Sequence, residues 1–190
     1  MKKISILLIV FTSISFGQDI VDSYSEVYYS LSFSIYNTRI MGGQSFVGNG
    51  KNISTAKFYA KKLGSPTGYC RAKVYAHQGT YGTDGVATGS PLAISDSINV
   101  ETISTVYDLV TFNFPSSYSL NNGSYYVIVC EYTGGNSSNC VQIGIDSYNL
   151  AHAGNLCYYT TSWQAVNARD ACFYVYGVSP TAFIPQITID

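Results

Sequence analysis

The residues able to carry catalytic chemistry are few in this chain and lie far apart in its sequence. The two histidines, His77 and His152, both fall at the edges of turn-rich segments. Either could assist a serine or cysteine nucleophile, but no spacing singles out such a partner. The three glutamates, Glu26, Glu101 and Glu131, are too scattered to indicate the paired carboxylates of a glycosidase. The pattern therefore favours a protein that binds over an enzyme.

The cysteines do not form a zinc-binding pattern, because the sequence contains no Cys-x-x-Cys. They lie at positions 70, 130, 140, 157 and 172. Their number is odd, so at least one stays unpaired within a monomer. Cys70 and Cys130 sit among apolar neighbours and are expected to be small core residues. Cys157 and Cys172 flank what we interpret as one hairpin, and a disulfide could join them across it.

Calcium is the one metal ion for which the sequence offers candidate ligands. Asp146, Asn155 and Asp170 fall in predicted loops that a β-sandwich can gather at one end, and calcium accepts carboxylate and amide oxygens. The same side chains are also typical of turn capping, which is the commoner use of Asx residues in loops. We therefore predict no obligatory cofactor and keep calcium as an open alternative.

Two predicted surfaces combine aromatic and charged side chains. The first is the outward face of residues 52–77, on which lysines and an arginine alternate with tyrosines: Lys57, Tyr59, Lys61, Tyr69, Arg71, Lys73 and Tyr75. If the two runs are neighbouring strands, this face is a basic patch able to meet an anionic polysaccharide, with Tyr59, Arg71, Lys73 and Tyr75 as contact residues. The alternative is a solvated sheet face on which basic side chains cover tyrosine rings.

The second surface lies late in the chain and carries Tyr158, Tyr159 and Trp163. Aromatic rings in an exposed loop can stack on the pyranose rings of sugars. The alternative is a buried tryptophan that closes one end of the fold. We predict that a ligand binds through the first surface or through these three residues.

The elements that position these residues are recognised by alternation with a period of two. In residues 54–60 and 70–76, small or apolar residues occupy every second position, as in half-buried strands. Between them, Gly64-Ser65-Pro66-Thr67-Gly68 predicts a chain reversal that makes the two runs a hairpin-like pair. Residues 125–132 are apolar on both faces and indicate a central strand.

Many short strands separated by turn signals, without helical periodicity, predict an all-β fold. We expect an antiparallel β-sandwich of jelly-roll type, forming a single domain over residues 18–178. Further strands are expected near residues 29–35, 109–114, 141–145, 156–160 and 171–178. Residues 77–92 are dense in Gly, Thr and Ser and predict a long exposed loop.

Composition and the N-terminus predict an exported protein. The chain has 190 residues, of which only 11% are charged and 15% aromatic, as is common in secreted β-proteins. A net charge of −1 favours neither nucleic acid nor an anionic membrane as partner. Residues 1–17 resemble a signal peptide cleaved before Gln18, with an uncleaved anchor as the alternative. No second apolar run of membrane length follows, and Pro180 and Pro185 indicate an extended tail over residues 179–190.

Several segments resemble an exported β-sandwich domain, the choice-of-anchor R family. They are Gly43-Gln44-Ser45-Phe46, KKLGSPTG (61–68), VYAHQGTYGT (74–83), GSYYVIVCEYTGG (123–135) and ARDACFYVYG (168–177). The resemblance implies an extracellular, non-catalytic, jelly-roll-like domain and supplies no catalytic residues. Residues 179–190 depart from the family, since they match neither a C-terminal anchor nor a sorting signal.

These observations predict a secreted or surface-located binding or adhesion module that recognises surface carbohydrate without catalysis. A structural subunit of an extracellular filament or phage particle is the alternative. In that case the strand at residues 28–35 or the tail would complete the sheet of a neighbouring copy, giving a homo-oligomer.

Overall fold

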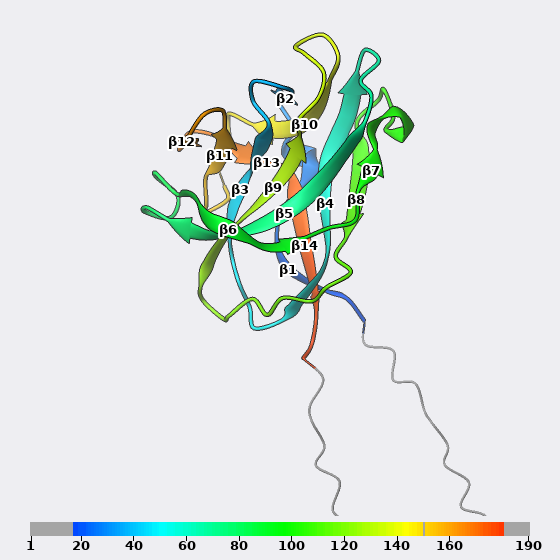
Figure 1. The fold of residues 1–190 in the computed structure, drawn as a ribbon. Helices are drawn as coiled ribbons and strands as arrows, with labels where there is room; N and C mark the ends of the chain where they lie inside the picture. The colour runs from blue at the N-terminus through cyan, green and yellow to red at the C-terminus, as the bar shows by residue number, and fades with distance from the viewer. Residues whose placement is uncertain (1–16, 150, 181–190) are drawn as a thin grey trace, which may run out of the picture.

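The computed structural model describes residues 17–149 and 151–180, which form two antiparallel β-sheets that pack together (Figure 1). The β-sandwich expected from the alternating pattern is therefore confirmed. Residues 1–16 of the expected signal peptide and residues 181–190 of the expected tail lie outside the described residues. Within the described ranges, no helix is long and apolar enough to cross a membrane.

The first sheet has the strand order β1-β14-β4-β10-β13, with β2 paired to β10 and β8 paired to β4. Its strands are β1 (Asp19–Tyr24), β2 (Leu31–Ile35), β4 (Asn52–Leu63), β8 (Asp108–Asn113), β10 (Cys140–Asp146), β13 (Asp170–Ala171) and β14 (Phe173–Val178). A 3-10 turn, η1 (Glu26–Tyr28), separates β1 from β2. The first and last described strands, β1 and β14, are thus neighbours.

The second sheet has the order β12-β11-β3-β9-β5-β6, with β7 paired to β5. Its strands are β3 (Met41–Val47), β5 (Tyr69–Gln78), β6 (Val86–Ile94), β7 (Ile98–Asn99), β9 (Tyr125–Tyr132), β11 (Leu156–Tyr159) and β12 (Trp163–Val166). A second 3-10 turn, η2 (Val100–Thr102), follows β7. The edge strands β6 and β12 also contact each other, so this sheet curls toward closure.

The turn at residues 64–68 joins the two sheets instead of two neighbouring strands. Gly64 and Gly68 adopt φ values of +66° and +95°, so the expected reversal is present. However, β4 belongs to the first sheet and β5 to the second. The expected hairpin-like pairing is wrong because both strands turn their small apolar residues toward one core from opposite sides.

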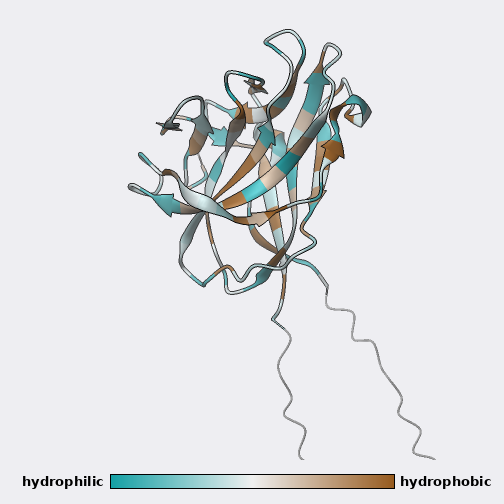
Figure 2. Cartoon of the chain, viewed as in Figure 1, coloured by the Kyte–Doolittle hydropathy of each residue, from teal (hydrophilic) through white to brown (hydrophobic). Residues whose placement is uncertain are grey.

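The main core fills the space between the sheets. Ala56 and Phe58 of β4 enter it from one side, and Ala72 and Val74 of β5 enter it from the other. All four are fully buried. Hydrophobic and hydrophilic bands alternate along several strands, as a sheet with one face on a core requires (Figure 2).

A second apolar cluster lies on the opposite face of the second sheet. In β9, Ile128 faces the main core, whereas Val127 and Val129 join this second cluster. The cluster also contains Met41 and Tyr75. Because β9 has apolar clusters on both faces and pairs with β3 and β5, its expected central position is confirmed.

Two segments differ from expectation because backbone pairing outweighs local composition. The second half of the expected loop at 77–92 contains most of β6, which pairs with β5 and buries Ala87. Trp163 lies in strand β12, which pairs with β11. Consequently β11 and β14 do not form the expected late hairpin, and they belong to different sheets.

This topology also separates the two cysteines considered for a disulfide. Cys157 joins the second cluster, whereas the backbone N–H of Cys172 donates to the carbonyl of Gly144 in the first sheet. All five cysteines lie within the described residues, and each is buried as a free thiol. The disulfide between Cys157 and Cys172 is therefore absent.

Candidate ligand-binding face and end pocket

Five of the seven predicted contact residues lie on one face of the second sheet, the face that carries the second apolar cluster. Arg71, Lys73 and Tyr75 alternate along β5, and their directly paired partners on β9 are Glu131, Val129 and Val127. Directly paired residues of antiparallel strands share a face. Tyr159 of β11 and Trp163 of β12 are paired in the same way and pack against the same cluster. We call these five residues with Glu131 the aromatic face.

The rings of the aromatic face contact one another edge to face. The centroid of the Trp163 ring lies 5.7 Å from that of Tyr75 and 5.3 Å from that of Tyr159, with interplanar angles of 69° and 68°. The Tyr75 hydroxyl donates to the sulfur of Met41 at 3.7 Å. Burial, reinforced by the charge of Glu131, raises the pKa of Tyr75 to about 12, so this phenol is neutral at physiological pH. Tyr75 is buried, whereas Trp163 and Tyr159 are half-buried.

Charged groups border these rings on the same face. The Lys73 Nζ and Glu131 Oε1 atoms form an ion pair at 2.6 Å. Arg71 is paired with Glu131 across the strands, is exposed, and makes no ion pair within the described part of the chain. The aromatic face therefore carries two basic groups and one acidic group, with one guanidinium free to contact a ligand.

Two predicted contact residues lie elsewhere. Tyr59 projects from β4 on the first sheet and stacks on Tyr107, with ring centroids 5.0 Å apart. The Tyr158 ring packs against Phe33 of the main core, with centroids 5.5 Å apart. The predicted continuous basic patch is wrong because Lys57 and Lys61 share Tyr59's strand, whereas Arg71 and Lys73 are on the second sheet.

A pocket of about 480 Å³ opens at another place, where β1, the end of β3 and four loops meet. Its lining includes Asp22 of β1, His152, Asn122 and Tyr81. Tyr81 stacks on Tyr125 with ring centroids 4.3 Å apart and an interplanar angle of 10°. This arrangement combines a carboxylate, an amide and an aromatic ring around one hollow.

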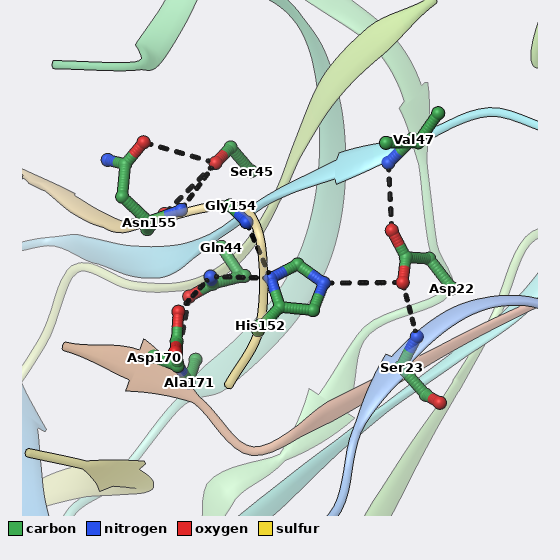
Figure 3. A network of polar contacts seen from close by, with 10 residues as sticks. All are labelled: Asp22, Ser23, Gln44, Ser45, Val47, His152, Gly154, Asn155, Asp170 and Ala171. Carbon is green, nitrogen blue, oxygen red and sulfur yellow. Dashed lines mark hydrogen bonds and ion pairs between the residues drawn. The ribbon is translucent and has the colours of Figure 1, made fainter. Parts of the chain in front are cut away.

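His152 is held on both sides of its ring (Figure 3). Its Nδ1 accepts from the backbone N–H of Gly154 at 3.0 Å and from the Gln44 side-chain amide at 3.1 Å. Nδ1 therefore carries no hydrogen, and the ring donates from Nε2 to Asp22 Oδ1 at 3.2 Å. Asp22 also accepts from the backbone N–H groups of Ser23 at 2.8 Å and Val47 at 2.9 Å.

A second carboxylate lies behind this histidine. The Gln44 amide donates to Asp170 Oδ1 at 2.7 Å, and its carbonyl accepts from the backbone N–H of Ala171. Burial raises the pKa of Asp170, outweighing the hydrogen bond from Gln44. The hydrogen-bonded series Asp22–His152–Gln44–Asp170 thus links β1, β3 and β13 through side chains alone.

The three residues considered as calcium ligands lie in or near this hydrogen-bonded series, but their oxygens accept hydrogen bonds from protein donors. Asp146 accepts from the Tyr24 hydroxyl at 2.7 Å and from the backbone N–H groups of Tyr148 and Asn149. Asn155 Oδ1 accepts from the Ser45 hydroxyl. Only the two backbone bonds to Asp146 are turn-capping contacts, the alternative weighed from sequence. The Asn155 and Asp170 oxygens instead accept from side chains of β3. Among the described residues, no group of three or more His, Cys, Asp or Glu side chains could hold a metal ion.

The other histidine, His77, packs beside Tyr81 and Tyr125. Its Nε2 is buried and has no hydrogen-bond partner among the described residues. Burial lowers the pKa of this imidazole, and the charge of Asp84 opposes that shift only in part.

The sequence pattern did not mark Asp22, Gln44, Tyr81 or Asn122 as site residues. Each lies in a different segment, and none belongs to a motif of fixed spacing. Only the turn signals around positions 81 and 122 marked places where side chains could meet at one end of a sandwich.

No family model matches the chain, and no curated protein matches it. Among solved structures, one match is the cysteine protease and lectin-like domains of a surface layer associated protein of Clostridium difficile, at 14% identity with a TM-score of 0.45. The match covers 75% of this chain and 33% of that one, so the chain spans about a third of that protein's length.

Proposed function

We propose that this chain is an exported, non-catalytic module that binds carbohydrate on the aromatic face. The observation that carries the proposal is the contact of Trp163 with both Tyr75 and Tyr159, next to the Lys73–Glu131 ion pair. Sugars present C–H groups on their ring faces and hydroxyls at their rims. A half-buried aromatic cluster bordered by charged hydrogen-bonding groups complements both.

The charged residues suggest the kind of sugar that is preferred. Glu131 can accept from sugar hydroxyls, and Lys73 can donate to them, while their ion pair fixes both groups in place. The free guanidinium of Arg71 can bind a carboxylate with two parallel hydrogen bonds. We therefore propose that polysaccharides containing uronic acids bind more tightly than neutral ones.

Binding without cleavage is supported by the same geometry. Glu131 is the only carboxylate among the residues that define the aromatic face, whereas retaining and inverting glycosidases commonly use two. Both ring nitrogens of His152 are engaged within the protein, which leaves neither to activate a nucleophile. Export is supported by the signal-like pattern of residues 1–17 and by the resemblance to choice-of-anchor R domains.

Trp163 is the only tryptophan of the chain, so its fluorescence reports on this face directly. The chain from Gln18 onward should be screened on a glycan array, with and without calcium, and hits titrated by tryptophan fluorescence. Tyr159→Ala and Arg71→Ala should each weaken binding about tenfold or more, the loss expected for one stacking or charge-assisted contact.

Tyr148→Ala is the matched control, because Tyr148 is 84% exposed and lies outside the aromatic face. It should leave affinity unchanged. Glycan binding that persists at full strength in both face variants would refute this site, and an array without hits would refute the function.

One observation favours a second candidate, a structural subunit. Among the described strands, β2 pairs only with β10, and apolar side chains on it or next to it are exposed: Val27 (76%), Tyr28 (43%) and Leu31 (40%). An exposed strand edge can pair with another copy. Light scattering would show concentration-dependent assembly, and Leu31→Lys or removal of residues 179–190 should abolish it. A monomer at all concentrations would exclude this candidate.

A further inference from the structure

The pocket at Asp22 has polar groups that the aromatic face does not use. Its volume of about 480 Å³ suits a small molecule. Its walls come from β1, the end of β3 and the loops around residues 48, 81, 122 and 152. No member of the aromatic face lines it.

Asp22 is the group in this pocket that is positioned to receive a hydrogen bond from a ligand. A carboxylate offers about four acceptor sites. Oδ1 accepts from Ser23 and His152, whereas Oδ2 accepts, among the described residues, only from the backbone N–H of Val47. One acceptor site on Oδ2 therefore remains. His152 acts as a positioning residue, because both of its nitrogens are already used.

The charge of the pocket selects against anions. Among the described residues that line the pocket, only Asp22, His152 and Tyr81 have ionisable side chains. Burial, together with the charge of Asp22, raises the pKa of Tyr81, so that phenol stays neutral. Lys51 does not line the pocket, and its Nζ contacts Asp19 at 2.6 Å.

The remaining lining supplies an aromatic wall and an amide rim. Tyr81 is fixed by stacking on Tyr125 at 4.3 Å, so its ring is held in place before a ligand arrives. A cation over an aromatic ring gains electrostatic stabilisation, and the gain adds to that of a nearby carboxylate. Asn122 is exposed at the rim and can both donate to and accept from hydroxyls.

We propose that this pocket at Asp22 binds a primary ammonium group on a small hydroxylated ligand, such as an amino sugar. Asp22 Oδ2 accepts from the ammonium, the Tyr81 ring packs against it, and Asn122 contacts a hydroxyl. This site is separate from the aromatic face, and each can exist without the other.

The test compares three probes that differ at one position: glucosamine, glucose and N-acetylglucosamine. Each is titrated into the full chain by calorimetry at neutral pH. Glucosamine should bind at least about tenfold more tightly than the other two, because only it carries an ammonium for a charge-assisted hydrogen bond. Equal affinity for the three, or no binding of glucosamine, would overturn the proposal.

Variants locate the site. Asp22→Asn should weaken glucosamine binding about tenfold or more, whereas Asp19→Asn, on the same strand but outside the pocket lining, should not. Since Asp22→Asn could disturb folding, Asn122→Lys provides a second test, because it places a cation at the exposed rim. It should also weaken glucosamine binding, and unchanged affinity would overturn the site. Tyr159→Ala should leave glucosamine binding intact, which separates failure here from failure of the aromatic face.

Discussion

The ring centroids of Tyr75 and Trp163 lie 5.7 Å apart, although their strands, β5 and β12, are not neighbours in the second sheet. The contact exists because this sheet curls until β6 and β12 meet. Aromatic side chains of β5, β11 and β12 then pack together within the curved sheet. The proposed carbohydrate site is a consequence of this curvature.

The contact between Trp163 and Tyr159 should contribute to stability as well as to binding. We expect Trp163→Ala to lower the free energy of unfolding by about 2 kcal/mol, since a half-buried ring loses part of its burial and its aromatic contacts. A double-mutant cycle with Tyr159→Ala should show a coupling of roughly 1 kcal/mol. Urea unfolding measures both values, and strictly additive effects would show that the rings do not interact.

The five cysteines should be unreactive until the protein unfolds. Burial raises the pKa of Cys157 and of Cys172 to about 12, and the pKa of Cys130 is also raised, mainly by its hydrogen bond with Cys70 and by burial. Because the thiolate is the reactive form, a thiol reagent should label the native chain only slowly. In denaturant without reductant, five thiols should react. Fewer than five would reveal a disulfide.

The buried carboxylates Asp170 and Asp146 should have opposite effects on the pH dependence of stability. The raised pKa of Asp170 means that its folded form holds a proton more tightly than the unfolded chain does. Protonated Asp170 therefore contributes to folding stability at pH values below its ordinary pKa of 3.8. This contribution is lost as the pH rises through the higher pKa of the folded state. Asp170→Asn should gain stability relative to wild type across that window.

Asp146 behaves in the opposite way. Burial opposes its charge, but hydrogen bonds from Tyr24 and from the backbone of Tyr148 and Asn149 outweigh burial and lower its pKa. Ionised Asp146 therefore contributes to folding stability at pH values above its ordinary pKa of 3.8. This contribution is lost as the pH falls through the lower pKa of the folded state. Asp146→Asn should therefore lose stability relative to wild type as the pH rises through that window. Urea unfolding at graded pH measures both variants, and parallel curves for the two would contradict at least one of the assignments.

The connection between the sheets can be tested with two glycines that differ in their surroundings. Gly64 and Gly68 both have positive φ, but an added Cβ would lie 2.3 Å from the Ser138 carbonyl oxygen at Gly64 and in open space at Gly68. Gly68→Ala should cost about 1 kcal/mol from backbone strain alone. Gly64→Ala should cost about 3 kcal/mol, because a backbone atom must also move. Equal urea midpoints would show that the connection tolerates movement.

The strands themselves could be predicted from sequence because their information is local. The alternation in residues 54–60 and the two apolar faces of residues 125–132 specify strand geometry and burial without reference to other segments. The structure accordingly confirms β4 and the central strand β9. Burial of Ala56, Phe58, Ala72 and Val74 also follows from the period of two.

Local patterns cannot determine which strands are partners. The turn at residues 64–68 is equally compatible with a hairpin within one sheet and with a connection between two sheets. In both arrangements the flanking strands can direct their apolar side chains toward a core. Only the packing of the whole chain placed β4 and β5 in different sheets, dividing the predicted basic patch. The same packing placed Arg71, Lys73, Tyr75, Tyr159 and Trp163 on one face.

The sequence alone thus determined the fold class, many of the strands and the alternating faces, because side-chain alternation and turn chemistry act over a few residues. The tertiary structure alone decided that Asp22 meets His152, and that the rings of Tyr75 and Trp163 touch. Such contacts depend on how far a sheet curls and where loops converge. Both are set by long-range packing and cannot be inferred from the spacing of residues in the sequence.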